Sequence, residues 1–147
     1  MLLIEGDITD ETSGLILHGV NTQAAMGSGV ALAIKNKWPI IYSEYMKQGK
    51  GRHLLGSCHI INVEPGLYVA NGYTQEFYGY DGKRYADPDA VRSVLYNAFK
   101  WCSENKIELK MPKIASARGG LDWPTEVVPL IEQYETIFEI QVKIIYK

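Results

Sequence analysis

The sequence has little cysteine, few histidines and no long apolar run. Its two cysteines, Cys58 and Cys102, stand far apart among 147 residues, which argues against a disulfide framework and fits reduced thiols. None of the three histidines has the paired spacing with cysteine or acidic residues that defines a zinc site. We therefore expect no metal and no cofactor. The longest apolar runs are only a handful of residues, far short of a membrane span, so we expect no membrane role.

Positive charge is also not concentrated anywhere in the chain. The 15 Lys and Arg residues are scattered against 17 Asp and Glu residues, giving a net charge of −2, so the electrostatic footprint of a nucleic-acid-binding surface is missing. We expect no direct binding to nucleic acid. The first residues, Met1–Asp7, do not resemble a signal peptide. Because 147 residues suit one compact core, we expect a single domain over residues 1–147. We also expect the protein to be cytoplasmic and monomeric.

Short apolar runs alternate with helical patterns along the chain. Strands are predicted at Leu2–Glu5, Leu15–His18, Cys58–Val63, Leu67–Ala70, Leu109–Ile114 and Phe138–Tyr146, the third and fourth forming a hairpin. Helices are predicted from Gly29 to Trp38, from Ile41 to about Gly49, from a cap at Asp87 or Asp89 to Cys102, and from Pro124. This alternation predicts an α/β fold, with a largely parallel sheet covered by helices on both faces.

The segment from Asn21 to Val30 follows an apolar strand, contains Gly27 and Gly29, and leads directly into a helix. Glycines let the backbone approach an anion closely, and the unpaired amides and dipole of a helix start attract negative charge. A dinucleotide fingerprint would need glycine or alanine where Leu32 stands, which disfavours a Rossmann site. The segment predicts an anion-binding loop, with a plain glycine turn as the alternative.

A second loop, Ser116–Pro124, has the same order of strand, glycines and helix start. In a parallel sheet both loops lie at the carboxyl ends of strands, where ligands of α/β proteins bind. A diphosphate would then be held between them. Arg118 would add positive charge there, although a single loop arginine is at least as often solvated surface.

Several segments together resemble the macrodomain family. They occur in the family's order across almost the whole chain and are Gly6-Asp7-Ile8-Thr9, His18-Gly19-Val20-Asn21, Met26-Gly27-Ser28-Gly29-Val30-Ala31, Met111-Pro112-Lys113-Ile114, Gly119-Gly120-Leu121-Asp122-Trp123 and Ile145-Tyr146. The resemblance implies a three-layer α/β/α fold, with a mixed and mostly parallel sheet of about six strands. It also implies binding of ADP-ribose or ADP-ribose 1″-phosphate.

The resemblance assigns a role to each matching residue. Asp7 would accept a hydrogen bond from the adenine amino group, the Ile8 amide would contact the ring, and Tyr146 would pack near it. Asn21 would face the distal ribose. The diphosphate loops would comprise Gly27, Ser28, Gly29 and Val30 on one side, and Ser116, Ala117, Arg118, Gly119, Gly120 and Leu121 on the other. A simple turn remains the alternative for Asp7, and plain core packing the alternative for Tyr146.

Within the family, the chain resembles ADP-ribose 1″-phosphate phosphatases. Related glycohydrolases that free ADP-ribose from acidic side chains or DNA rely on a lysine after a threonine, but here Gln75 follows Thr74, and a neutral amide cannot form an imine with the ribose aldehyde. His18 and Asp122 are the predicted catalytic residues. Asp122 would orient or deprotonate the attacking water, while His18 would shuttle a proton or attack phosphorus. A satisfied core histidine and a helix cap are the alternatives.

The sequence leaves two other functions open, and it leaves the role of one segment open. The chain could be a non-catalytic reader of ADP-ribose, of ADP-ribosylated partners or of NAD-derived signals. Hydrolysis of ADP-ribosyl esters through Asn21 and Asp122 ranks third. The aromatic segment Thr74–Tyr85 is too long for a simple connection; its Gln75, Phe77 and Tyr78 would close over the distal ribose, cover the sheet edge or meet another chain.

Overall fold

The structure, a computed structural model, describes residues 1–79 and 81–147. Its single sheet has the strand order β1-β6-β5-β2-β4-β3. The strands are β1 (Leu2–Glu5), β2 (Gly14–Asn21), β3 (Cys58–Glu64), β4 (Leu67–Gln75), β5 (Leu109–Met111) and β6 (Lys143–Tyr146). All neighbours are parallel except the antiparallel β3–β4 hairpin, so the expected mixed, mostly parallel sheet is confirmed.

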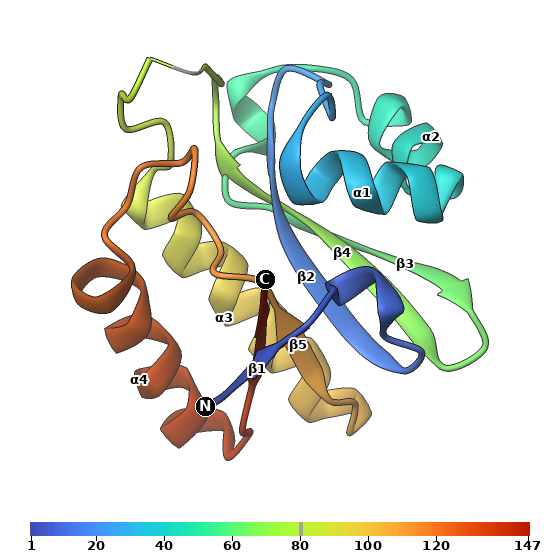
Figure 1. Cartoon of the computed structure of the whole chain (residues 1–147), viewed down its shortest axis with the longest axis vertical. Coiled ribbons are helices and arrows are strands. Elements are labelled where there is room, and N and C mark those ends of the chain that lie inside the picture. Colours follow the sequence, from blue (N-terminus) through green and yellow to red (C-terminus); the bar gives the residue numbers. More distant parts are fainter. Residues whose placement is uncertain (80) are drawn as a thin grey trace.

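Helices cover both faces of the sheet (Figure 1). On one face lie α1 (Gly29–Lys37) and α2 (Pro39–Lys47), and on the other lie α3 (Pro88–Asn105) and α4 (Val128–Phe138). Successive side chains of a strand point to opposite faces. In β2, Leu15 and Leu17 therefore join the core beneath α3 and α4, while Ile16 and Val20 join the core beneath α1 and α2. The result is the expected three-layer α/β/α fold.

Local chemistry accounts for two helix starts. Pro39 separates α1 from α2, because proline has no amide hydrogen and is preorganised for the first helical turn. Asp87 caps α3 by accepting hydrogen bonds from the amides of Asp89 (2.9 Å) and Ala90 (3.3 Å). Of the two caps considered from the sequence, Asp87 is therefore the right one.

Strands β2, β4 and β5 differ clearly in length from their predicted ranges, and β4 continues past Ala70 to Gln75. β2 continues past His18 to Asn21, so it reaches the carboxyl edge of the sheet together with β4. β5 ends at Met111 rather than at Ile114, because Pro112 has no amide hydrogen to continue the ladder. The chain after β5 consequently leaves the sheet early and forms a loop at the same carboxyl edge.

The predicted strand Phe138–Tyr146 is wrong in its first half. Phe138 is the last residue of α4, and its ring lies 6.3 Å from that of Phe99 in α3, centroid to centroid. The following residue, Glu139, adopts a left-handed conformation (φ 54°) that ends the helix. Only residues from Lys143 onward form β6, which lies between β1 and β5.

Candidate functional site

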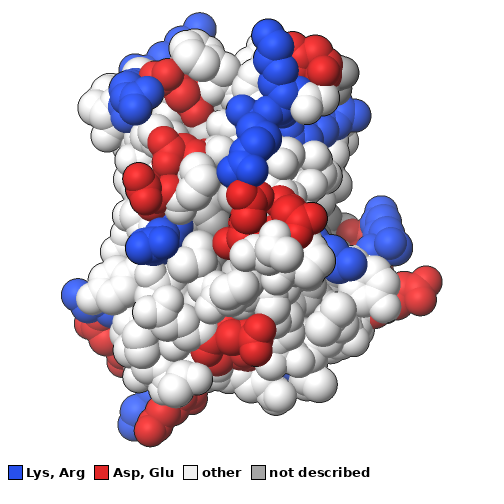
Figure 2. All heavy atoms as spheres, turned by 90° about the vertical axis from the view of Figure 1, so that its left-hand side faces the viewer, with Lys and Arg blue, Asp and Glu red and all other residues white. Residues whose placement is uncertain are grey.

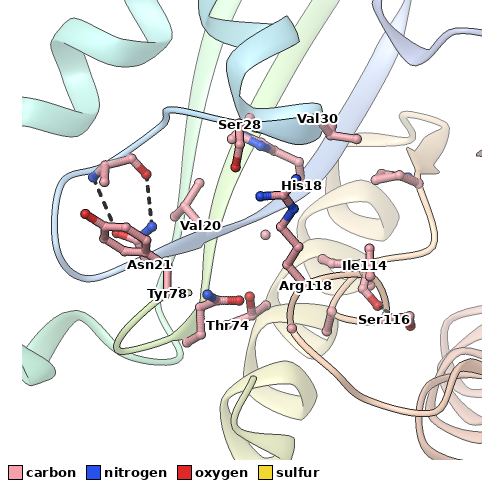
Figure 3. Close-up of a pocket in the computed structure, with 18 of the residues that line it drawn as sticks. His18, Val20, Asn21, Ser28, Val30, Thr74, Tyr78, Ile114, Ser116 and Arg118 are labelled. Carbon is pink, nitrogen blue, oxygen red and sulfur yellow. Dashed lines mark hydrogen bonds between the residues drawn. The ribbon is translucent and has the colours of Figure 1, made fainter. Parts of the chain in front are cut away.

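A cleft of about 270 Å³ opens at the carboxyl ends of β2, β4 and β5 (Figure 3). The predicted residues that line it are His18, Asn21, Gly27, Ser28, Val30, Gln75, Tyr78, Ser116, Ala117, Arg118 and Gly119. Those outside its lining are Asp7, Ile8, Gly29, Phe77, Gly120, Leu121, Asp122 and Tyr146. The two glycine loops thus meet at one cleft, as predicted, whereas the two predicted catalytic residues do not.

Asn21 holds the first loop in shape from within. Its side-chain nitrogen donates to the Ala25 carbonyl (2.9 Å), and its side-chain oxygen accepts from the Gln23 amide (2.9 Å). The same oxygen accepts a hydrogen bond from the Tyr45 hydroxyl of α2 (2.9 Å). Asn21 lines the cleft, but its side-chain amide already makes hydrogen bonds within the protein. The Asn21 side chain therefore stabilises the loop that leads to Gly27.

An alanine in the left-handed conformation that normally favours glycine occurs at each loop. Ala24 in the first loop has φ 59°, and Ala115, directly before the second loop, has φ 63°. Such conformations cost free energy and persist only where the surrounding structure enforces them. Both loops are therefore held in shape by their surroundings rather than by local preference.

The second loop is tied to the segment that precedes α3. The Gly119 carbonyl accepts hydrogen bonds from the amides of Tyr85 (3.0 Å) and Ala86 (2.9 Å). A Cβ at Gly119 would lie 2.5 Å from the Ala115 carbonyl oxygen, so only glycine fits there. Gly120 needs glycine as well, because its φ is 80°. The loop and the end of the aromatic segment form one packed unit.

His18 is buried at the floor of the cleft. It is 1% exposed, and its Nε2 lies 2.6 Å from Oδ1 of Asn71, which is fully buried. Burial lowers the pKa of His18 from 6.5 to about 4, against the opposing effect of the Asn71 hydrogen bond. The imidazole is therefore neutral at physiological pH, and its Nδ1 has no hydrogen-bond partner within residues 1–79 and 81–147.

Two basic side chains lie on the wall opposite the first loop. Arg118 and Lys113 both line the cleft, and Figure 3 shows the Arg118 side chain reaching from its loop towards His18. The Lys113 ammonium lies 5.0 Å from the centre of the Tyr146 ring. Since His18 is neutral, the cleft carries net positive charge and suits an anionic ligand.

Asp7 and Tyr146 lie together beyond the Lys113 end of the cleft. The Gly6 amide donates to the Tyr146 carbonyl at 2.7 Å. The Asp7 carboxylate accepts hydrogen bonds from the Thr9 hydroxyl and amide, and it lies 3.2 Å from the Lys147 ammonium. These contacts lower the pKa of Asp7 to about 2. Asp7 thus forms the turn that was its alternative assignment, and its predicted contact with adenine remains a prediction.

Asp122 is a helix cap. Its carboxylate accepts hydrogen bonds from the Thr125 amide (3.2 Å) and hydroxyl, and so begins a π-helical turn, Trp123–Val127, that leads into α4. The helix expected at Pro124 starts with this turn. Asp122 is exposed and does not line the cleft. The alternative cap assignment is therefore observed, and a catalytic role for Asp122 remains a prediction.

Residues of the aromatic segment Thr74–Tyr85 line two different hollows. Gln75 and Tyr78 line the cleft, and the Gln75 side-chain amide donates to the Phe77 carbonyl at 2.7 Å. Phe77 is 57% exposed and borders a neighbouring shallow hollow instead. Tyr80 lies outside the described residues. Two of the three predicted lid residues therefore line the cleft, and their closure over the distal ribose stays a prediction.

The surface beside the cleft carries charges of both signs. Figure 2 shows Lys and Arg interspersed with Asp and Glu on this face. The pairs nearest the hollow are Arg84–Glu126 (2.7 Å), Arg52–Glu76 (3.4 Å) and Lys83–Asp81 (3.7 Å). Basic and acidic side chains are therefore paired around this hollow.

The described part of the chain contains neither a metal-binding cluster nor a membrane-spanning helix. Among those residues, no three His, Cys, Asp or Glu side chains gather where they could hold a metal ion. Within residues 1–79 and 81–147, none of the helices is long and apolar enough to cross a membrane.

The predicted site residues did not include Thr74 and Lys113, which line the cleft, or Asn71, which contacts His18. Thr74 is the next-to-last residue of β4, and Lys113 follows the end of β5. Both could have been found, because they stand at the carboxyl ends of strands, where this fold class binds ligands. Asn71 had no such signal, because it contacts His18 across 53 residues of sequence.

We expect the free energy of unfolding to fall by about 3 kcal/mol as pH is lowered from about 6.5 to about 4, because of His18. Its pKa is lower in the folded state, so over this range the unfolded chain binds the extra proton and is favoured. Urea unfolding at several pH values would measure this slope. His18→Gln should flatten it, whereas His53→Gln, at an exposed histidine, is the control; an equal slope in His18→Gln would contradict the assignment.

No family model matches the sequence. The DNA ADP-ribosyl transferase–DNA ADP-ribosyl glycohydrolase fusion protein of Thermosipho africanus is 27% identical over 97% of this chain and 40% of its own length. The DNA ADP-ribosyl glycohydrolase of Thermus aquaticus is 21% identical over 95% of this chain and 39% of its own length. The chain thus spans about two fifths of the length of these curated relatives.

Solved structures resemble the chain over its whole length. A protein from Bacteroides thetaiotaomicron has a TM-score of 0.85 and 27% identity, covering 100% of this chain and 99% of the other. A macrodomain protein from Streptomyces coelicolor has a TM-score of 0.79 and 25% identity, covering 99% and 97%. Thermosipho africanus DarTG in complex with ADP-ribose has a TM-score of 0.76 and 21% identity, covering 99% and 42%. With its sheet order and paired glycine loops, the chain belongs to the macrodomain family.

Proposed function

We propose that the chain, as a monomer and a single domain, binds ADP-ribose in the cleft and hydrolyses the terminal phosphate of ADP-ribose 1″-phosphate. The observation that carries this proposal is the meeting of two glycine loops at one cleft on the carboxyl edge of the sheet. Such a site offers backbone amides to a diphosphate from two sides. The similarity to Thermosipho africanus DarTG, solved with ADP-ribose, supports the same ligand.

The first loop is prepared for an anion. Ser28 occupies the position before α1 but makes no side-chain hydrogen bond to the first turn. Gly27 lines the cleft, and a Cβ built there has no atom within 4 Å. Phosphate oxygens can therefore approach the backbone and accept hydrogen bonds from amides at the start of α1. Arg118 and Lys113 would neutralise the charge from the opposite wall.

Hydrolysis would depend on His18. A neutral imidazole can accept a proton or attack phosphorus, but at neutral pH it cannot donate as an imidazolium. In the first case the water oxygen bonds to phosphorus while His18 takes its proton. The bond from phosphorus to the ribose oxygen then breaks, and that oxygen takes up a proton. Arg118 and the loop amides would stabilise the negative charge on the phosphoryl oxygens.

A second candidate is removal of ADP-ribose from DNA. It is favoured by the similarity to two curated proteins that carry this activity in their names. Two observations weigh against it. Gln75 stands where the related glycohydrolases have lysine, and its amide is bonded to the Phe77 carbonyl. The basic residues beside the cleft are paired with acids, which disfavours a DNA strand there.

One set of assays separates these functions. Calorimetry with ADP-ribose tests binding, and ADP-ribose 1″-phosphate, ADP-ribosylated DNA and ADP-ribosylated protein are offered as substrates. We expect binding together with phosphate release. Release of ADP-ribose from DNA or from protein esters instead would favour the glycohydrolase or the esterase. Binding without any turnover would leave a reader, and no binding would overturn the ligand itself.

A further inference from the structure

His18 and Asn71 form a buried polar pair on neighbouring strands. His18 in β2 pairs in register with Asn71 in β4. Both point to the face covered by α1 and α2, because they alternate with Leu17 and Ala70, which belong to the core on the opposite face. The two side chains are 1% and 0% exposed, and their 2.6 Å hydrogen bond is positioned by the register of the two strands.

The chemistry of this contact decides which imidazole nitrogen carries the hydrogen. The amide oxygen of asparagine can only accept a hydrogen bond, so Nε2 of His18 must donate to Oδ1 of Asn71. The neutral ring carries one hydrogen, and Nδ1 is then an acceptor with a free lone pair. Among the described residues Nδ1 is buried without a hydrogen-bond partner. Because His18 lines the cleft, a ligand or water that reaches Nδ1 from there would meet this acceptor.

A third residue extends the pair across the sheet. His59 in β3 pairs in register with Asn71 from the other side. Among the described residues, the side-chain nitrogen of Asn71 and Nδ1 of His59 are both buried without a hydrogen-bond partner. When His59 carries its hydrogen on Nε2, its Nδ1 is an acceptor, and one water would bridge it to the Asn71 donor. Such a bridge would keep the Asn71 oxygen turned towards His18.

We propose that Asn71 is the positioning residue of the cleft, holding His18 as the Nε2–H tautomer so that Nδ1 faces the reacting phosphate group as an acceptor. The catalytic consequence rests on the proposed phosphatase function, whereas the tautomer does not. Outer partners that orient a functional histidine commonly change activity by tenfold or more. Asn71 would act in this way, through His18 and without touching the substrate.

Nuclear magnetic resonance of ¹⁵N-histidine-labelled protein tests the tautomer directly. We expect the His18 signals of the wild type to show hydrogen on Nε2 and none on Nδ1. Asn71→Leu keeps the side-chain size but removes the acceptor, so a mixture of tautomers is expected. Asn62→Leu, on the exposed part of β3, is the control. A wild type with hydrogen on Nδ1, or an unchanged tautomer in Asn71→Leu, would overturn the proposal.

Kinetics provide the second readout. Asn71→Leu should lower kcat for phosphate release about tenfold and leave KM within about twofold. Asn71→Asp keeps an acceptor and adds a negative charge, so it should retain the tautomer and move the acidic limb of the pH profile to higher pH. The other titratable or charged groups facing this region are Lys113 and Arg118 across the cleft, with Tyr45, His59 and Tyr73 around the pair.

The two possible failures are distinguishable. If the wild type releases no phosphate but His18 carries its hydrogen on Nε2, the phosphatase function falls and the positioning by Asn71 stands. If the wild type is active and Asn71→Leu, still folded by circular dichroism, keeps its kcat, Asn71 is not a positioning residue. Asn71→Ser supplies a smaller polar variant for the case in which leucine prevents folding, and it should give the same direction of change.

Discussion

Replacing Gly27 with valine is expected to weaken the binding of ADP-ribose about 100-fold while changing the free energy of unfolding by less than about 0.5 kcal/mol. A Cβ at Gly27 meets no atom within 4 Å, so the protein itself has room for the side chain. Gly27 lines the cleft, however, and a diphosphate needs that room. Losing two charge-assisted hydrogen bonds would cost about 3 kcal/mol of binding. Calorimetry and urea unfolding measure the two effects separately.

Two other glycines make matched controls for Gly27. Gly66 lies in the β3–β4 turn and also has room for a Cβ, but its φ is 75°. Gly66→Ala should therefore lose about 1 kcal/mol of stability and keep its affinity. Gly119→Ala should lose both, because its Cβ would collide with the Ala115 carbonyl. Unchanged affinity in Gly27→Val would mean that the diphosphate does not bind at the first loop.

His18→Gln is expected to lower the rate of phosphate release about 1000-fold, with the affinity for ADP-ribose within about threefold of wild type. Glutamine can still hydrogen bond to Asn71, which preserves the buried contact. It cannot accept a proton from water at neutral pH or form a covalent phosphoryl intermediate. Single-turnover phosphate release, with binding measured separately, checks both parts of this expectation. A variant that keeps the wild-type rate would remove His18 from the mechanism.

Asp122→Asn tests the other predicted catalytic residue without disturbing the fold. Asparagine is a good helix cap and can still accept the hydrogen bond from the Thr125 amide, so stability should be retained. The position of Asp122 outside the cleft lining predicts near-normal phosphate release. A fall comparable to that of His18→Gln would instead indicate that the second loop moves to bring the carboxylate to the substrate. Asp122→Ala should mainly cost about 1 kcal/mol of stability.

Much of the fold could be predicted because the deciding signals are local. Apolar runs marked the strands, and Asp87 and Asp89 marked the region where α3 would start. Phe138 shows where local signals fail. An aromatic residue followed by β-branched ones favours a strand, but burial of its ring against Phe99 keeps it in α4. Only the packing of α4 on α3 could have decided this, and that packing joins residues distant in sequence.

The candidate site, like the fold, was predictable only where the signal is local in sequence. Both loops were predicted from glycines between a strand end and a helix start, because that local order exposes backbone amides to an anion. The environment of His18 was not predictable, since its neutral state arises from burial under α1 and α2 and its partner comes from another strand. Asp122 was correctly recognised as a possible cap from its neighbours, but its distance from the cleft depended on how the second loop folds.

The link between Gly119 and residues 85–86 limits how this cleft could diverge. One carbonyl in the diphosphate loop accepts both amides at the end of the segment whose other end, Gln75 and Tyr78, borders the distal part of the cleft. A change that reshapes this segment for a different group on the ribose would also pull on the diphosphate loop. Substrate choice and diphosphate affinity should therefore change together when this segment changes.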